Sequence, residues 1–80
     1  MESRRTWSPD GRHGRLVVRL GDLEAHGTVF RSSRHSGCMW TGPVLPGQER
    51  NAGGIACCVD VGKARAFEAC SALLRAAVAA

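Results

Sequence analysis

The stretch RLVVRLGDLEAHGTVFRS, from Arg15 to Ser32, decides the fold because it carries the pattern of a β-hairpin. Apolar residues alternate in its first half, and one side of that strand carries Leu16, Val18 and Leu20. The other side carries Arg15, Val17 and Arg19. The dipeptide Gly21-Asp22 predicts a tight turn into a second strand that reaches Ser32. Gly27 marks a bulge or a close backbone approach within this second strand.

The residues before the hairpin predict a flexible start and one short edge strand. We expect about five flexible residues at the N-terminus, as is common at chain ends. A short strand around Thr6 and Trp7 follows and is expected to pair at the edge of the sheet. SPDG, from Ser8 to Gly11, predicts a turn, because proline presets its first dihedral and Asp-Gly tolerates the rest.

The residues after the hairpin predict two more strands separated by loops. SRHSG is a polar loop, and CMWTG, from Cys38 to Gly42, is the third main strand. PVLPGQERNAGG, from Pro43 to Gly54, is rich in proline and glycine, so it predicts a long exposed loop. IACCVDV, from Ile55 to Val61, then predicts the last strand.

The C-terminal part predicts a helix from Lys63 to Val78, with Asp60 or the turn after it as the N-terminal cap. Its apolar stripe is Ala66, Phe67, Cys70, Leu73, Leu74, Ala77 and Val78. Charged Arg65, Glu68 and Arg75 face away from it. The fold class is therefore α+β, an antiparallel sheet of three to five strands with one C-terminal helix packed on one face. Residues 1–80 form a single domain, and the other sheet face is solvated, dimerised or bound to a partner.

Composition and charge restrict the compartment and the partners. The net charge is +4, and arginine, which suits phosphate and carboxylate partners, is concentrated in the first half of the chain. A GC-rich genome that encodes arginine in place of lysine explains the same bias. No apolar segment resembles a signal peptide or a membrane span, so we expect a cytoplasmic protein with no membrane contact.

Cys57 and Cys70 are interpreted first as core residues. Alternation along the predicted last strand places Cys57 towards the helix, near Cys70, and Cys58 on the opposite face. A zinc site built from His35, Cys38 and Cys58 is a weaker alternative, because no Cys-x-x-Cys pair completes it. A thiol nucleophile paired with a histidine is formally possible, but no spacing selects the histidine.

Catalytic signatures are missing from the sequence. Gly62-Lys63 resembles the end of a phosphate-binding loop, but the earlier glycine position is occupied by Cys57 and the residue after the lysine is Ala64. The acidic residues form no obvious general acid–base pair. We therefore expect a protein that is not an enzyme and that uses no cofactor.

The uncovered sheet face is the expected binding surface. Its first strand presents Arg15 and Arg19, and the second presents either His26, Thr28 and Phe30, which we favour, or Ala25, Gly27 and Val29. Met39 or Trp40 adds an anchor from the next strand. The candidate partner-binding residues are Arg15, Arg19, His26, Phe30 and Arg50. Arginine with aromatic residues is typical of protein interfaces and of sheets that stack bases. Alternatively, Trp7, Phe30 and Trp40 complete a small core.

The hairpin GRLVVRLGDLEAHGTVF and the ending VDVGKARAFEAC resemble small phage and mobile-element proteins that place a β-meander before a helix. Among these, anti-CRISPR proteins are similar in size and character. The resemblance implies an inhibitor that binds a subunit of a CRISPR effector complex in the bacterial host cell and blocks target-DNA binding or nuclease recruitment. Many such inhibitors are acidic DNA mimics, so the positive charge departs from that pattern and favours an acidic protein surface or occlusion by bulk.

The leading hypothesis is therefore a non-enzymatic binding protein, a monomer or homodimer, that acts by protein–protein contact. The alternative is a small basic nucleic-acid-binding domain that uses an Arg/aromatic sheet face, although no RRM or KH signature is present. A zinc-dependent module ranks third.

Overall fold

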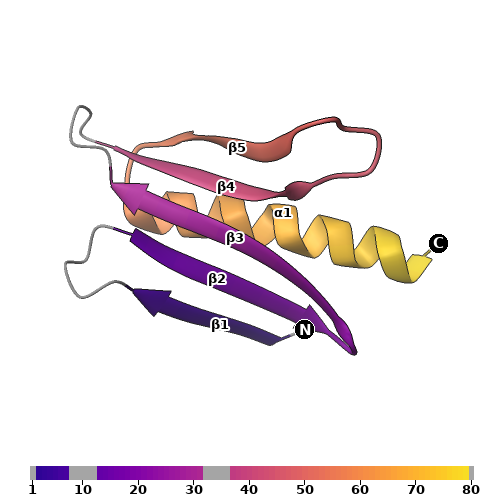
Figure 1. The fold of residues 1–80 in the computed structure, drawn as a ribbon. Coiled ribbons are helices and arrows are strands. Elements are labelled where there is room, and N and C mark those ends of the chain that lie inside the picture. The colour runs from indigo at the N-terminus through magenta and orange to yellow at the C-terminus, as the bar shows by residue number, and fades with distance from the viewer. Residues whose placement is uncertain (1, 8–12, 32–36, 80) are drawn as a thin grey trace.

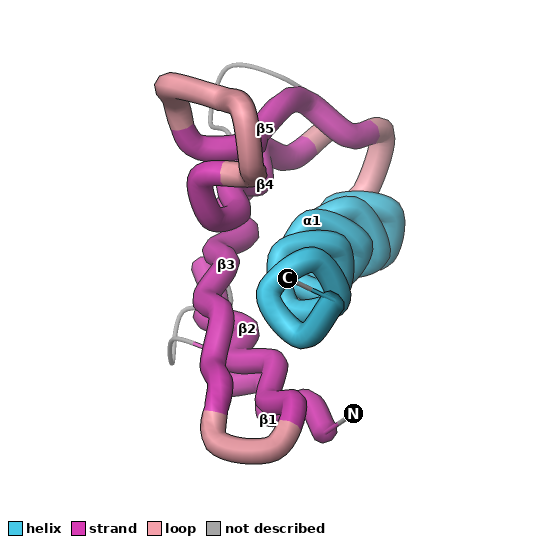
Figure 2. Tube along the Cα trace, turned by 90° about the vertical axis from the view of Figure 1, so that its right-hand side faces the viewer, coloured by secondary structure: helices cyan, strands magenta, loops and turns pink. Residues whose placement is uncertain are grey.

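The computed structural model describes residues 2–7, 13–31 and 37–79 of the chain. The described residues form five strands and one helix: β1 (Glu2–Trp7), β2 (His13–Leu20), β3 (Leu23–Arg31), β4 (Cys38–Val44), β5 (Asn51–Ala56) and α1 (Val59–Ala79). The strands are antiparallel neighbours in the order β1-β2-β3-β4-β5 (Figure 1). Seen along the sheet, α1 lies on one face only (Figure 2). The predicted α+β fold class is confirmed.

The central β2–β3 hairpin has the predicted turn and the predicted faces. Gly21 adopts a φ of +63°, a left-handed conformation that glycine takes without steric cost, so the chain reverses within two residues. Leu16 and Val18 are buried beneath α1, whereas Arg15 and Arg19 are exposed. The hairpin therefore presents Leu16 and Val18 to the helix, and it presents Arg15 and Arg19 to the other side of the sheet.

The helix lies close to the sheet because small residues line the seam between them. A Cβ on Gly27 would lie 2.9 Å from the carbonyl oxygen of Thr41 and 3.2 Å from the Cβ of Ala66. A Cβ on Gly62 would lie 2.6 Å from the Sγ of Cys38. The predicted close backbone approach at Gly27 is confirmed, and its neighbours are the backbone of β4 and the side of the helix.

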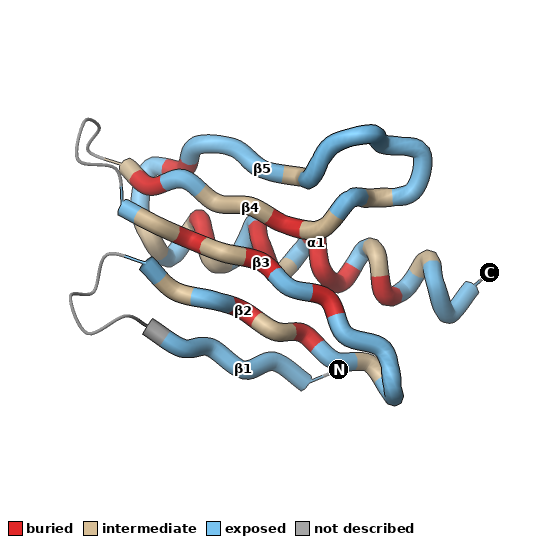
Figure 3. Tube along the Cα trace, in the orientation of Figure 1, coloured by how far each residue is buried: buried red, intermediate tan, exposed pale blue. Residues whose placement is uncertain are grey.

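The core is a thin aliphatic layer between α1 and strands β2 to β5 (Figure 3). The largest of its fully buried side chains are Leu74, Val18, Val29, Cys38 and Cys70. Within the described chain, α1 contacts every strand except β1. The described side chains of β1 are therefore exposed on both faces of the sheet.

The prediction of a long loop from Pro43 to Gly54 is wrong. β4 continues to Val44, β5 begins at Asn51, and the connection spans only residues 45–50. The glycines of β5 are tolerated because the indole of Trp40, paired with Gly54 in the register, lies over that glycine. An aromatic ring on a cross-strand glycine supplies the packing that the missing side chain does not.

The predicted last strand from Ile55 to Val61 is also wrong at its second half. β5 ends at Ala56, and α1 begins at Val59, four residues before the predicted start. The amide of Gly62 donates to the carbonyl of Cys58 at 3.0 Å, which places Cys58 at the N-terminal cap position. Asp60 is therefore not the cap but lies in the first turn, where a negative charge favours the helix dipole.

The helix buries most, but not all, of its predicted stripe. Ala66, Cys70 and Leu74 are buried, Phe67 and Leu73 are half-buried, and the end of the stripe is exposed at Val78. Arg65, Glu68 and Arg75 are exposed as predicted.

The N-terminal strand is longer than predicted. β1 begins at Glu2, which pairs with Arg19, so the residues expected to be flexible belong to the sheet edge. The side chain of Trp7, the predicted turn from Ser8 to Gly11 and most of the SRHSG loop lie outside the described residues.

Candidate functional site

The face of the sheet opposite α1 is covered by no described element, and we call it the open face. Alternation along each strand decides which residues reach it. Ala25, Gly27 and Val29 are buried beneath the helix, so His26, Thr28 and Phe30 lie on the open face. This is the arrangement that the sequence favoured.

One end of the open face is apolar. The register pairs Phe30 of β3 with Met39 of β4, and Met39 with Ile55 of β5. Directly paired residues lie on the same face, so these three side chains form one row across three strands, which we call the apolar row. Met39 is 40% exposed and Ile55 is 69% exposed. The row therefore exposes apolar surface to water, and removing that surface from water would be favourable.

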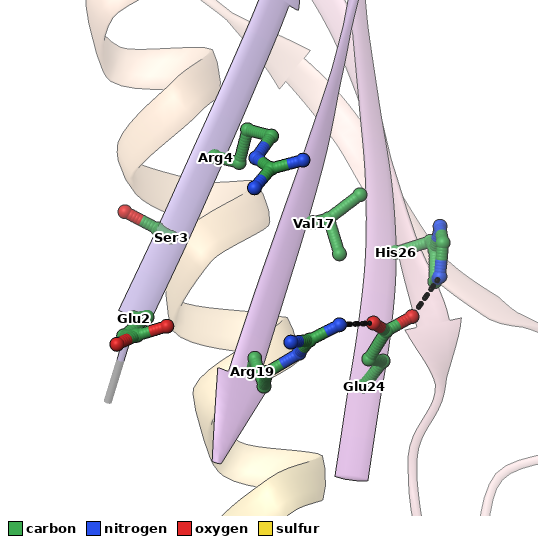
Figure 4. Close-up of a pocket in the computed structure, with 7 residues that line it drawn as sticks. All are labelled: Glu2, Ser3, Arg4, Val17, Arg19, Glu24 and His26. Atoms are coloured by element: carbon green, nitrogen blue, oxygen red, sulfur yellow. Dashed lines mark hydrogen bonds and ion pairs between the residues drawn. The ribbon is translucent and has the colours of Figure 1, made fainter. Parts of the chain in front are cut away.

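The other end of the open face is charged and hollowed. Glu2 and Arg4 of β1, Val17 and Arg19 of β2, and Glu24 and His26 of β3 surround a shallow hollow of about 530 Å³ (Figure 4). Figure 4 shows that these side chains come from three neighbouring strands. Charges of both signs are present, so the hollow is not a simple anion site.

One ion pair and one histidine–carboxylate contact organise this charged end. A nitrogen of Arg19 lies 2.5 Å from Oε1 of Glu24, and Nε2 of His26 lies 3.5 Å from Oε2 of the same carboxylate. The hydrogen bond from Arg19 holds the pKa of Glu24 below its ordinary value, and the positive charge of Arg19 adds to this effect. Glu24 is therefore ionised at neutral pH, and its negative charge is paired with the positive charge of Arg19.

Between the two ends lies Arg15, whose guanidinium makes no ion pair with another described residue. Its direct partner in the register is Thr28, whose hydroxyl is hydrogen-bonded to the hydroxyl of Thr41. Arg15, Thr28 and Thr41 thus form one row across three strands, and the apolar row is the next row on this face. An arginine that is not neutralised beside exposed apolar side chains is typical of a protein interface.

The structure brings together four of the five predicted binding residues. Arg15, Arg19, His26 and Phe30 share the open face. Arg50 does not join them, because it lies in the connection between β4 and β5, at the other edge of the sheet from β1 and β2. Arg50 is exposed but belongs to neither the apolar row nor the hollow.

The sequence interpretation left the choice between Met39 and Trp40 open, and it missed Ile55 and Arg4. The alternation that placed Cys57 towards the helix also placed Ile55 there. Met39 is the anchor from β4, whereas Trp40 pairs with Val29 and packs against the core. Ile55 was expected beneath the helix, yet it lies on the open face and Ala56 is buried instead. Arg4 was missed because β1 was predicted too short. The available signal was the alternation of the small residues Ala52, Gly54 and Ala56, which leaves Ile55 on the other side of the strand.

The cysteines divide into two pairs. Cys38 and Cys70 are buried, and burial raises the pKa of both thiols; for Cys38, the neighbouring Cys58 and Cys57 add to the increase. Cys70 is a core residue as predicted. The prediction that Cys57 packs near Cys70 is wrong, because Cys57 and Cys58 are both exposed in the connection between β5 and α1.

The predicted zinc ligands are described only in part. His35 lies outside the described residues, and the thiol of buried Cys38 donates to the carbonyl oxygen of Cys58 at 3.1 Å. Among the residues that the structure describes, no group of three histidine, cysteine or acidic side chains is arranged to hold a metal ion.

No helix within the described ranges has the length and apolar character needed to cross a bilayer.

Comparison of the chain with protein-family models, with curated proteins and with solved structures finds no match. The functional interpretation of the open face therefore rests on its own geometry and chemistry.

Proposed function

We propose that the protein is a non-enzymatic binding protein that presents its open face to a partner protein. One observation carries this proposal. Phe30, Met39 and Ile55 form a continuous row on the uncovered face, in which Phe30 is half-buried and Met39 and Ile55 are exposed. Large apolar side chains that the fold leaves exposed in one row mark an interaction surface.

The charges of the open face indicate the chemistry of the partner. Arg15 lies beside the apolar row, and Arg4 borders the hollow without an ion pair to another described residue. Arginine donates well to carboxylates, and central interface arginines carry much of the binding energy. The complementary surface is therefore apolar at its centre and bordered by aspartate or glutamate.

A nucleic-acid partner fits this surface less well. Glu2 and Glu24 lie on the same face as the arginines, and Arg19 is already paired with Glu24. Carboxylates repel the phosphate backbone that dominates the affinity of nucleic-acid binding. The nucleic-acid alternative thus predicts a basic surface that the open face does not have.

The resemblance to anti-CRISPR proteins names a subunit of a CRISPR effector complex as the partner to test first. The proposed action is occlusion, in which the open face covers a surface that the effector needs to engage target DNA. The resemblance alone supports this finer part of the proposal, whereas the open face supports protein binding in general.

The experiment is a capture assay with the purified protein as bait. The probe is a lysate of bacteria that express a CRISPR effector complex, used with and without nuclease treatment and washed at low and at high salt. Met39→Asp places a charge in the apolar row, and Val78→Asp is the matched control, because Val78 is an exposed apolar residue on α1. A second variant, Arg15→Ala, removes the arginine beside the row.

We expect the parent and Val78→Asp to retain an effector subunit, and Met39→Asp and Arg15→Ala to lose it while keeping the melting temperature of a folded domain. Truncation of a central interface residue costs about 2 kcal/mol or more of binding. Capture that is unchanged in both variants would overturn the open-face proposal. Capture that disappears after nuclease treatment would support the nucleic-acid alternative instead.

A further inference from the structure

Cys57 and Cys58 lie side by side at the surface, which the sequence alone did not predict. A continuous strand would have placed adjacent side chains on opposite faces. The chain instead bends between β5 and α1, and the two Sγ atoms lie 4.0 Å apart. Both residues are exposed, so the pair is open to solvent and to small reagents.

The backbone that carries this pair is anchored on both sides. Ala56, which precedes it, is buried, and Val59, which follows it, packs against the core. The carbonyl of Cys58 accepts hydrogen bonds from the amide of Gly62 at 3.0 Å and from the thiol of Cys38 at 3.1 Å. The two thiols are therefore held near each other before any ligand arrives, which lowers the entropy cost of binding.

We propose that Cys57 and Cys58 form a vicinal dithiol site that chelates a soft, thiophilic metal or metalloid centre through both sulfur atoms. Thiolates are the protein ligands that such soft centres prefer. Two sulfur atoms on adjacent residues close a chelate, so the second bond forms at a high effective concentration. The connection between β5 and α1 is anchored, so the two thiols are already close together. A pair of cysteines on a flexible segment would lose more conformational entropy on binding.

A trivalent arsenical illustrates the chemistry and serves as the probe. Phenylarsine oxide reacts with two thiols to form two arsenic–sulfur bonds, and its oxygen leaves as water with the two thiol protons. Arsenic stays trivalent and neither sulfur is oxidised, so the step needs no oxidant or reductant. Buried Cys38 and Cys70 are not expected to react in the folded protein.

The test measures the adduct of the full chain with phenylarsine oxide by intact mass under native conditions. We expect one equivalent that resists an excess of a monothiol but is removed by a dithiol. Trypsin cleaves after Arg50 and Lys63, so the adduct should map to the peptide 51–63, which contains only Cys57 and Cys58 of the four cysteines. Cadmium ion, followed by its thiolate absorbance, tests whether the same pair also holds a divalent soft metal ion.

Cys57→Ser and Cys58→Ser should each weaken retention at least about 100-fold, because each leaves a single sulfur and abolishes the chelate. Neither change should alter the melting temperature much, since both side chains are exposed. An adduct that a monothiol removes, that survives in either variant or that maps to Cys38 would overturn the proposal. Cadmium binding without arsenical binding would also overturn it, because the site would then need ligands beyond the pair.

Discussion

The two faces of the sheet differ in how closely their side chains are packed. Beneath α1 the seam consists of glycine, alanine and cysteine, and the largest fully buried side chains there are leucine and valine. On the open face the residues across three strands are phenylalanine, methionine and isoleucine, and Met39 and Ile55 are largely accessible. A small domain gains stability by burying its large apolar side chains, and Met39 and Ile55 leave much of theirs in contact with water.

The two faces therefore place different requirements on the size of their residues. Close packing of α1 requires small residues, because the helix backbone approaches the strands closely at Gly27, Gly42 and Gly62. The open face has no such restriction and can hold large side chains for a partner. Changes on the covered face should therefore affect folding, and changes on the open face should affect binding.

The largest expected effect is that of Leu74→Ala on the covered face. Leu74 is 2% exposed, and truncating a buried leucine costs about 2–5 kcal/mol of the free energy of unfolding. The matched change on the open face is Ile55→Ala, which should cost less than about 1 kcal/mol. Urea unfolding followed by circular dichroism measures both. Equal losses would show that the apolar row contributes to folding as much as the core does.

A smaller effect tests the close contact of α1 with β4. A Cβ on Gly42 would lie 2.8 Å from the Cβ of Ala69, so Gly42→Ala should cost about 1–3 kcal/mol by overpacking. In an Ala69→Gly background the same change should cost less, because the clashing methyl group is gone. Gly27→Ala is the control, since its clashes are with Thr41 and Ala66 and should persist in that background. Identical costs of Gly42→Ala in both backgrounds would contradict this packing.

The smallest effect concerns the ion pair of the open face. Arg19 lowers the pKa of Glu24 from its ordinary value of 4.5, so the pair stabilises the fold above that pH, and the stabilisation is lost as the pH falls through the lowered pKa. The melting temperature of the parent should therefore exceed that of Glu24→Gln slightly at pH 7 in low salt, and the two should converge once the pH falls below the lowered pKa of Glu24. A difference in melting temperature that persists in strong acid would have a cause other than this ion pair.

The hairpin was predictable because its signals are local. Alternation and a glycine turn act within a few residues, so the sequence was enough to assign the faces of β2 and to favour the correct outward face of β3. The helix was predictable for the same reason, since its apolar stripe from Ala66 to Leu74 has the helical period.

The region from Pro43 to Val61 was predicted wrongly because its structure depends on distant partners. Glycine and proline normally indicate a loop, but the indole of Trp40 covers Gly54 and allows β5 to pair. The end of β5 at Ala56 then decided the position of both cysteines that follow. A shift of the strand end by a few residues changed one buried and one outward thiol into an exposed pair.

The sequence by itself determined the α+β class, the central hairpin, the helix and the arginine side of β2, because periodicity and turn chemistry act over a few residues. Only the tertiary structure decided which large apolar residues stay exposed, where β5 ends and that Cys57 and Cys58 lie together. Those features depend on how closely α1 packs on the sheet, and that distance is set by small residues brought together from separate elements.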